Sequence, residues 1–364
     1  MHIYYDYQIF ALQNVGGISR YFVELASRLP RRFPEIKTTI LAPVHINDYL
    51  GSSSVDTIGR KFPMFPGKHH VLTPVNLFAS RFLLKQSKPD IFHETYYSAQ
   101  SQAVSAPRIL TVYDMIHERF PEQFHGPDLE IPALKAAAVA RADHLITISH
   151  KTCEDLIRFL AVPPEKITVI PLASSFVKSS EDAGKQGLEK PYLLYVGLRQ
   201  GVKNFSTLLA AFSHSKSLRS DFDLLCVGGG KFTATELQAI EDGGLSRQVK
   251  HVQASDAVLA TLYSQARLFV YTSLYEGFGL PLLEAMRCGC PVVCSQTGSM
   301  PEIAGDAALY FDPLDEEEMQ TVLEETAQSE KTLEALRIRG YKREQLFSWE
   351  RCVEQTAELY RSLL

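Results

Sequence analysis

The sequence predicts an α/β protein built from two doubly wound domains, each with a parallel sheet. With 364 residues, the chain is longer than one hydrophobic core usually serves. Short runs of branched and aromatic residues alternate with helical stretches along the whole chain, which is typical of right-handed βαβ units. A polar stretch without periodicity separates two such series. We therefore expect domains at 1–172 and 191–348, joined by a linker at 173–190 and facing each other across a cleft.

Six short apolar runs mark the strands expected in each domain. In the first domain they lie within HIYYD, TTILAP, DIFHE, RILTVYD, HLITIS and ITVIPL. In the second they lie within YLLYVG, DLLCVG, VKHVQA, LFVYTS, PVVCSQ and ALYFDP. Branched and aromatic residues favour strands in runs of this length. The last segment, residues 349–364, contains EQTAELYRSLL and is expected to be a helix.

Composition places the chain among soluble globular proteins, with 45% hydrophobic and 22% charged residues. The opening MHIYYD has an acidic residue where a secretory signal needs a basic flank and an apolar run. No segment approaches the ~18 apolar residues of a membrane span. The six cysteines are scattered, and Cys288, Cys290 and Cys294 lack the paired C-x-x-C spacing of a zinc site. We expect free thiols in a reducing cytoplasm, and no bound metal.

Charge is distributed unevenly along the chain, although the net charge is only −5. Residues 60–89 hold six cations and no acid, whereas residues 315–330 hold seven acids and no base. Within the basic segment, NLFASRFLLKQSK mixes large apolar side chains with cations, as a membrane-surface helix does. An ordinary amphipathic helix with its apolar side on the core is the alternative. Nucleic acid is not an expected partner, because the chain is acidic overall and has no recognised reading module.

Two glutamates lie in the stretch YEGFGLPLLEAM, residues 275–286, at the junction between a strand and a helix. Pro281 suits a first helical position and Gly289 the residue just past the end, so LPLLEAMRC is expected to be a short helix. Glu276 then lies in the loop after the strand, and Glu284 in the first helical turn. In doubly wound sheets this edge binds ligands. The alternative for Glu284 is a favourable interaction with the helix dipole.

Two further loops combine glycine with basic residues. NVGGISRYFVELASRL opens a helix in which Gly16 and Gly17 allow backbone amides to approach a phosphate. In VGLRQGVKNFSTLLAAF, Arg199 and Lys203 follow a strand and precede a helix capped by Asn204. Cations that neutralise phosphates, beside carboxylates that accept hydrogen bonds from diols, suit a sugar joined to a nucleoside diphosphate.

Several other signatures are excluded or have a structural interpretation. GGGK at 228–231 lacks the first glycine and the hydroxyl residue of a phosphate loop, and it also fails the dinucleotide fingerprint. DFD at 221–223 could hold a divalent metal, but a turn into the following strand is the favoured interpretation. In GSMPEIAG, Ser299 and Glu302 are expected to form a capping box, although Glu302 could also face the cleft.

Taken together, these residues resemble glycosyltransferase family four, the retaining transferases of the GT-B fold. The resemblance rests on Glu276 and Glu284 in their GFGLPLLEAM context, the following GCPVV, VG-x-R with KN after it, and GGISRY near the start. It extends over nearly the whole chain in the expected order. It implies two Rossmann-like domains, with the sugar nucleotide held mainly by the second domain and the acceptor by the first. It also implies that no metal or other cofactor is needed, and that the helix at 349–364 crosses back to the first domain.

The resemblance also implies roles for individual residues. Arg199 and Lys203 would hold the diphosphate, Glu284 the ribose hydroxyls and Glu276 the transferred sugar. The expected donor-binding residues are Gly16, Gly17, Arg199, Lys203, Glu276, Gly277, Phe278, Gly279, Leu280 and Glu284. The expected catalytic residues are Glu276, Arg199, Lys203, His117 and Asp114. Transfer with retention would proceed by departure of the diphosphate and attack on the same face, assisted by the leaving phosphate.

The sequence departs from the family pattern in TVYDMIHERFPE. Many relatives have a histidine immediately before the aspartate at the end of the fourth strand, whereas this chain has Tyr113 before Asp114. His117 either takes over the sugar contact or is an ordinary loop histidine. His93, at the end of DIFHE, is a weaker candidate for the same cleft.

The leading hypothesis is a cytoplasmic hexosyltransferase of polysaccharide assembly. Its donor would be a nucleoside diphosphate sugar, with UDP-glucose ahead of GDP-mannose, and its acceptor a glycan or a lipid-linked glycan. Peripheral membrane contact through residues 60–89 would place it at the inner face of the membrane. One alternative is an epimerase or hydrolase of the sugar nucleotide on the same fold. Another is a noncatalytic sugar-nucleotide-binding subunit.

Overall fold

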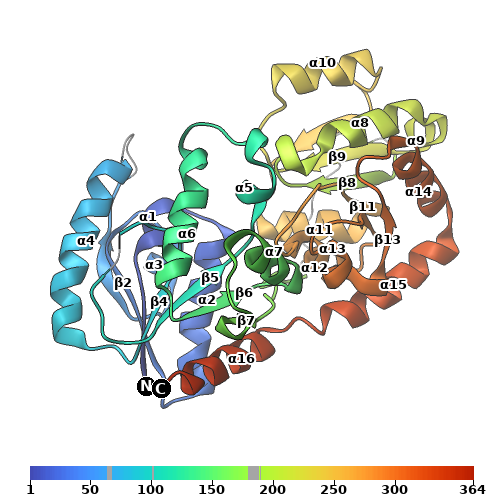
Figure 1. The fold of residues 1–364 in the computed structure, drawn as a ribbon. Coiled ribbons are helices and arrows are strands. Elements are labelled where there is room, and N and C mark those ends of the chain that lie inside the picture. The colour runs from blue at the N-terminus through green and yellow to red at the C-terminus, as the bar shows by residue number, and fades with distance from the viewer. Residues whose placement is uncertain (64–67, 101, 179–187, 189) are drawn as a thin grey trace. The chain divides into compact units, whose positions relative to one another are not determined.

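A computed structural model describes residues 1–63, 68–100, 102–178, 188 and 190–364. The chain divides into two compact units. Unit 1 comprises Met1–Leu172 and Glu350–Leu364, and unit 2 comprises Ala173–Trp349. Each unit is a parallel sheet with helices on both faces (Figure 1), which confirms the predicted pair of doubly wound α/β domains. Most of the predicted linker at 173–190 lies outside the described residues.

Unit 1 contains a seven-stranded parallel sheet among its described residues, in the order β3-β2-β1-β4-β5-β6-β7. The strands are β1 His2–Tyr5, β2 Lys37–His45, β3 Thr57–Lys61, β4 Ile91–Glu94, β5 Arg108–Val112, β6 His144–Thr147 and β7 Ile167–Val169. The α-helices are α1 Gln8–Leu12, α2 Gly17–Arg32, α3 Asp48–Ser52, α4 Lys68–Ser87, α5 Ile116–Arg119, α6 Ile131–Arg141, α7 His150–Leu160 and α16 Trp349–Ser362. Short 3₁₀ turns are η1 Pro121–Gln123, η2 Gly126–Glu130 and η3 Pro164–Lys166.

Unit 2 contains a six-stranded parallel sheet in the order β10-β9-β8-β11-β12-β13, again among the described residues. The strands are β8 Tyr192–Val196, β9 Asp223–Val227, β10 Val249–Val252, β11 Leu268–Tyr271, β12 Val292–Ser295 and β13 Ala308–Phe311. The α-helices are α8 Phe205–His214, α9 Lys216–Asp221, α10 Ala234–Asp242, α11 Asp256–Gln265, α12 Leu280–Arg287, α13 Met300–Ala304, α14 Glu316–Gln328 and α15 Glu330–Glu344. The 3₁₀ turns are η4 Gly201–Lys203 and η5 Gly305–Ala307.

All twelve predicted strands are present, and β3 is the strand that the sequence did not predict. β3 (TIGRK) lies at the sheet edge and has no fully buried residue, so it lacks the apolar run that marks the others. In both sheets the strand order reverses beside the first strand, between β1 and β4 and between β8 and β11. Loops leaving the carboxyl ends of such a pair diverge and leave a crevice, which is where doubly wound sheets bind ligands.

Helix α16 is tied to the sheet of unit 1 through a buried histidine. The Tyr360 hydroxyl lies 2.6 Å from Nδ1 of His93, and the Thr111 hydroxyl lies 2.8 Å from its Nε2. The Tyr5 hydroxyl is 3.3 Å from that of Tyr360. Burial lowers the pKa of His93 to about 3, because a charged ring would be desolvated there. With no exposed surface, His93 is a core residue, and its interpretation as a cleft residue is wrong.

Candidate active site

In unit 2, the loops that follow β8 and β11 are joined directly by hydrogen bonds. The Leu274 amide donates to the Val202 carbonyl at 2.7 Å, and the Thr272 hydroxyl donates to the Lys203 carbonyl at 2.9 Å. Since β8 and β11 are neighbours at the reversal of strand order, these bonds build one wall from two separate segments of the chain. This wall carries the residues that the sequence predicted as central.

Lys203 and Glu276 form an ion pair at this crevice. The Lys203 ammonium donates to a Glu276 carboxylate oxygen at 2.6 Å, and the Ser273 hydroxyl donates to the same oxygen at 2.6 Å. The two charged side chains are 24% and 13% exposed, so the pair is partly desolvated yet reachable from solvent. Each charge lowers the cost of holding the other at this depth. The structure thus brings together a cation and a carboxylate that lie 73 positions apart in the sequence.

The backbone of the Glu276 loop is held from behind by Ser299. Its hydroxyl lies 3.0 Å from the Glu276 carbonyl and 2.9 Å from that of Phe278. The capping box expected from Ser299 and Glu302 is therefore wrong, because this hydroxyl bonds to the loop and makes no cap bond to α13. Gly298 has a φ of 61°, and a Cβ there would lie 2.8 Å from the Glu276 amide nitrogen. Glycine is required where the two segments approach this closely.

Helix α12 begins at Leu280, where the predicted helix LPLLEAMRC begins, but Pro281 is not its first residue. Gly279 adopts a left-handed conformation, with a φ of 95°, and Leu280 is the first helical residue. Pro281 therefore occupies the second position, and Glu284 lies in the second turn instead of the first. The helix dipole acts mainly on the first turn, so it accounts less well for a carboxylate at Glu284. Gly277 and Phe278, in the loop that precedes the helix, are both buried.

A buried tyrosine positions Glu284. The hydroxyl of Tyr263, on α11, donates to a Glu284 carboxylate oxygen at 3.3 Å. Tyr263 is fully buried, and burial, followed by the negative charge of Glu284, raises its pKa well above the usual range. The hydroxyl therefore stays protonated and remains a donor. The sequence analysis missed Tyr263, although a tyrosine on a core-facing helix requires a partner for its hydroxyl.

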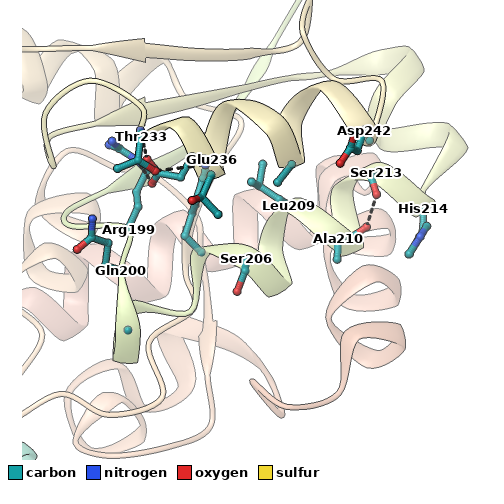
Figure 2. Close-up of a pocket in the computed structure, with 15 residues that line it drawn as sticks. Arg199, Gln200, Ser206, Leu209, Ala210, Ser213, His214, Thr233, Glu236 and Asp242 are labelled. Carbon is teal, nitrogen blue, oxygen red and sulfur yellow. Dashed lines mark hydrogen bonds and ion pairs between the residues drawn. The ribbon is translucent and has the colours of Figure 1, made fainter. Parts of the chain in front are cut away.

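Arg199 is placed differently from the loop cation that the sequence predicted. Its guanidinium donates to Glu236 at 2.7 Å, to the Gly228 carbonyl at 2.6 Å and to the Gly230 carbonyl at 2.8 Å. Figure 2 shows Arg199 directed at Thr233 and Glu236 at the start of α10. The side chain is 2% exposed, so the guanidinium is enclosed by protein groups and does not project from the loop into solvent. Among the described residues, no hydrogen bond or ion pair joins this guanidinium to Lys203 or Glu276.

Three successive glycines explain how the chain surrounds Arg199. Gly228, Gly229 and Gly230 all have positive φ values, from 68° to 85°, which only glycine adopts readily in succession. This conformation turns their carbonyls toward the guanidinium. Asn204 occupies the N-cap position of α8, as expected, but its side chain makes no capping hydrogen bond to the helix. Its side chain donates to the Pro313 carbonyl at 2.8 Å and accepts a hydrogen bond from the Thr207 hydroxyl.

In unit 1, Asp114 and His117 lie just after β5, beside a buried lysine. Lys135, on α6, is fully buried and donates to the Asp114 carbonyl at 2.9 Å and to the Glu118 carboxylate at 2.8 Å. Burial lowers the pKa of His117, and its ring packs against Phe124 with centroids 4.1 Å apart. The sequence signal for Lys135 was a cation in the middle of the largely apolar helix IPALKAAAVAR, and it was missed.

Gly16 and Gly17 lie at the start of α2, as the sequence predicted. Gly16 precedes the helix and Gly17 is its first residue. The Gln13 side-chain carbonyl accepts a hydrogen bond from the Ser19 amide at 3.2 Å, and a Cβ on Gly16 would clash with that carbonyl group. A side chain at position 16 would therefore displace the Gln13 amide group, whereas a Cβ at Gly17 would meet no atom within 4 Å. These residues belong to unit 1, whereas Lys203, Glu276 and Glu284 belong to unit 2.

Two protein-family models match the two units in turn. Residues 15–173 match Glycosyltransferase Family 4, and residues 178–343 match Glycosyl transferases group 1. The chain belongs to glycosyltransferase family four. Among relatives of this glycosyltransferase, O-antigen chain mannosyltransferase B of Escherichia coli is 29% identical over 369 residues, covering 95% of this chain and 96% of that protein. O-antigen chain mannosyltransferase RfbU of Salmonella typhimurium is 31% identical, covering 60% of each chain.

Solved glycosyltransferase structures share the fold. The crystal structure of Anabaena HepE in complex with UDP-glucose matches with a TM-score of 0.76 at 16% identity, covering all of both chains. At that identity the likeness shows the GT-B fold, in agreement with the expectation from sequence. No described helix of this glycosyltransferase is both long enough and apolar enough to cross a bilayer.

The described part of the glycosyltransferase contains no cluster of three or more His, Cys, Asp or Glu side chains that could hold a metal ion. Asp221 ends α9 and Asp223 begins β9, where it is buried and accepts a hydrogen bond from the Lys190 amide. The interpretation of DFD as a turn into a strand is thus confirmed. The six cysteines are free thiols, as the sequence predicted.

Proposed function

We propose that the protein transfers a mannosyl group from GDP-mannose, with retention, to a free or lipid-linked glycan in polysaccharide assembly. Membership of the family supports glycosyl transfer, and the names of two relatives near 30% identity support mannose as the transferred sugar. The sequence alone favours UDP-glucose over GDP-mannose, and the relatives' names reverse that order. Unit 2 would hold the donor and unit 1 the acceptor.

The observation that carries this proposal is the Lys203–Glu276 pair at the β8–β11 crevice. In the free protein the ammonium is held by a carboxylate at 2.6 Å. A diphosphate carries more negative charge than one carboxylate and offers more acceptor oxygens, so it would draw Lys203 away from Glu276. Glu276 would then accept hydrogen bonds from the hydroxyls of the transferred sugar. Donor binding would thus break the Lys203–Glu276 ion pair and replace it with contacts from Lys203 to the diphosphate and from Glu276 to the sugar.

Helix α12 would complete the donor site. The amides of Gly279 and Leu280 lie at its positive end, which favours a phosphate. Glu284, one turn further on, would accept hydrogen bonds from the ribose diol while Tyr263 holds its carboxylate from the core side. Gly277 and Phe278 would shape the loop over the diphosphate. Arg199 would support the loop from within instead of touching the donor.

The chemical step needs charge stabilisation more than a base. The bond between the sugar C1 and the phosphate oxygen breaks, the acceptor hydroxyl bonds to C1 on the same face, and its proton passes to the leaving phosphate. Lys203 and the α12 amides would stabilise the charge that develops on that phosphate. Because these groups supply the positive charge, we expect transfer to continue in excess EDTA.

Asp114 and His117 would act from unit 1. Burial lowers the pKa of His117, so the ring is neutral near pH 7 and can donate a hydrogen bond to a sugar hydroxyl without adding charge. Lys135 holds the Asp114 carbonyl and thereby positions the turn that carries both residues. Gly16 and Gly17 would bring the start of α2 close to a phosphate.

Binding and transfer assays test the proposal together. The purified protein is titrated calorimetrically with GDP, GDP-mannose, UDP and UDP-glucose, and transfer from labelled GDP-mannose to a lipid-linked glycan extract is followed with and without EDTA. We expect GDP-mannose to bind most tightly and label to appear in the glycan fraction only when acceptor is present. Failure of all four nucleotides to bind would overturn the proposal. Rapid donor breakdown without acceptor would instead indicate a hydrolase or epimerase.

A further inference from the structure

Helix α4 of unit 1 exposes aromatic side chains and buries polar ones. Phe78 and Phe82 are 80% and 63% exposed, and Val75 is exposed beside them. On the opposite side, Asn76 and Ser80 are almost completely buried. An ordinary amphipathic helix turns polar residues outward, so that alternative does not account for the three apolar side chains on the outer face of α4.

The rotation of α4 about its axis is fixed by Asn76. Its side-chain amide donates to the Val44 carbonyl at 2.8 Å, and its side-chain carbonyl accepts from the Val44 amide at 2.8 Å. Val44 lies in β2 at the end of an irregularity in the β2–β3 register, which begins after Leu41. The asparagine thus satisfies both backbone groups of a strand residue where the pairing is disturbed.

Packing along the same ridge reinforces this orientation. Leu72, one turn before Asn76, is buried, and so is Leu84, one turn after Ser80. Residues four apart share one face of a helix, so these four residues form the inner side. Phe78 and Phe82, also four apart, therefore share an outward face that the helix cannot turn inward without breaking both bonds to Val44.

Positive charge accompanies the exposed aromatic residues. Arg81, Lys85 and Lys88 are exposed on or just after the helix. The chain has no acidic residue from 60 to 89, although its net charge is −5. Exposed aromatic residues interleaved with cations match the two layers of an anionic bilayer surface, whose apolar region receives the rings and whose headgroups receive the charges.

We propose that the outward face of α4, formed by Val75, Phe78, Arg81, Phe82 and Lys85, docks on the surface of a bilayer that contains anionic lipid. This would hold the protein at a membrane without a spanning helix. The charge argument favours lipid over a second copy of this chain, because two like-charged α4 faces would repel each other. The inference does not depend on which sugar is transferred.

Vesicle binding by the full chain tests this proposal. The protein is sedimented with vesicles of phosphatidylcholine alone and of phosphatidylcholine with phosphatidylglycerol. We expect binding only to the mixed vesicles, and we expect it to weaken as salt is added. A Phe78→Ser, Phe82→Ser double variant should bind roughly tenfold less tightly or worse, since each ring loses its apolar contact. Each of Arg81→Gln and Lys85→Gln should weaken binding about fivefold.

Matched variants on unit 2 serve as controls. Leu314 is as exposed as Phe78, and Lys216 is an exposed lysine on α9, so Leu314→Ser and Lys216→Gln should leave vesicle binding unchanged. Thermal unfolding of all variants should match that of the native protein. Equal binding by the native protein and the double phenylalanine variant would overturn the proposal. So would a dimer in solution that the double variant abolishes, because a second copy would then cover the face.

Discussion

Arg199 and Lys203 lie four residues apart after the same strand, yet the regions around them differ in kind. The guanidinium is enclosed by Glu236 and the carbonyls of a triple-glycine loop, and the side chain is 2% exposed. The ammonium meets one carboxylate and remains 24% exposed. A cation whose donors are already satisfied by rigid groups stabilises the fold, whereas a cation held by one partly exposed carboxylate can be passed to a ligand.

In unit 1, two histidines differ in the same way, in how fully their hydrogen-bonding groups are satisfied by the protein. Both ring nitrogens of His93 have partners in the core, whereas His117 is only half buried, with Nδ1 lacking a hydrogen-bond partner among the described residues. The comparison therefore suggests a general criterion for this molecule. We expect the buried and fully bonded Arg199 and His93 to act on stability, and we expect Lys203 and His117 to act on substrate.

The largest expected effect is on stability, at Arg199. Arg199→Met leaves the Glu236 carboxylate and several carbonyls without their donor, so it should lower the free energy of unfolding by roughly 3 kcal/mol. The double variant Arg199→Met, Glu236→Gln should recover part of this loss, because no uncompensated charge remains. Urea unfolding measures both, with the exposed Arg247→Met as control. Native-like stability with strongly reduced turnover would place Arg199 on the donor, as the sequence suggested.

Lys203 should show the opposite pattern. Lys203→Met removes a positive charge from the leaving diphosphate, so turnover should fall roughly 10²-fold or more. The free energy of unfolding should change by only about 1 kcal/mol, since the ion pair is partly solvated. Steady-state kinetics and urea unfolding measure the two effects, with Lys216→Met as control. If turnover stays near normal, the comparison between the two cations fails.

A pH experiment extends the comparison to His93. Its pKa is lowered from 6.5 to about 3 by burial, so below pH 6.5 the unfolded chain takes up a proton that the folded protein does not. The neutral, buried His93 therefore contributes fully to the free energy of unfolding above pH 6.5. Below pH 6.5 its contribution falls by about 1.4 kcal/mol per pH unit. The stability difference between the native protein and His93→Gln should therefore shrink by about 2 kcal/mol between pH 7 and pH 5. The half-buried His117→Gln should show a smaller change, and an unchanged His93 difference would contradict the account.

The smallest effect concerns Tyr263. Tyr263→Phe removes one hydrogen bond to the Glu284 carboxylate, worth about 1 kcal/mol, so affinity for the nucleoside diphosphate should fall about fivefold. Tyr192→Phe provides the control, because that hydroxyl donates to the Leu262 carbonyl and touches no carboxylate of the site. Equal losses of affinity in both variants would show that core packing, and not the position of Glu284, is responsible.

The sequence predicted the fold well because strand patterns are local. The exposed edge strand β3 was missed because its pattern is weak. The proximity of Lys203 and Glu276 was also predictable, since the carboxyl ends of parallel strands share one sheet edge. The surroundings of Arg199 were not, because three successive left-handed glycines decide where carbonyls point. Ser299 was misjudged for a similar reason, as a tertiary contact takes the hydroxyl that a local motif would use.

Calorimetric titration of nucleoside diphosphate into Glu276→Gln and Glu284→Gln tests the central claim most directly. In the native protein the diphosphate must displace Glu276 from Lys203, so Glu276→Gln should bind it as tightly as native or more tightly, while turnover falls. Glu284→Gln should lose roughly 1 to 3 kcal/mol of affinity for both the diphosphate and the intact sugar nucleotide. The claim would be contradicted if Glu276→Gln weakened diphosphate binding as much as Glu284→Gln does, or if neither substitution changed affinity or rate.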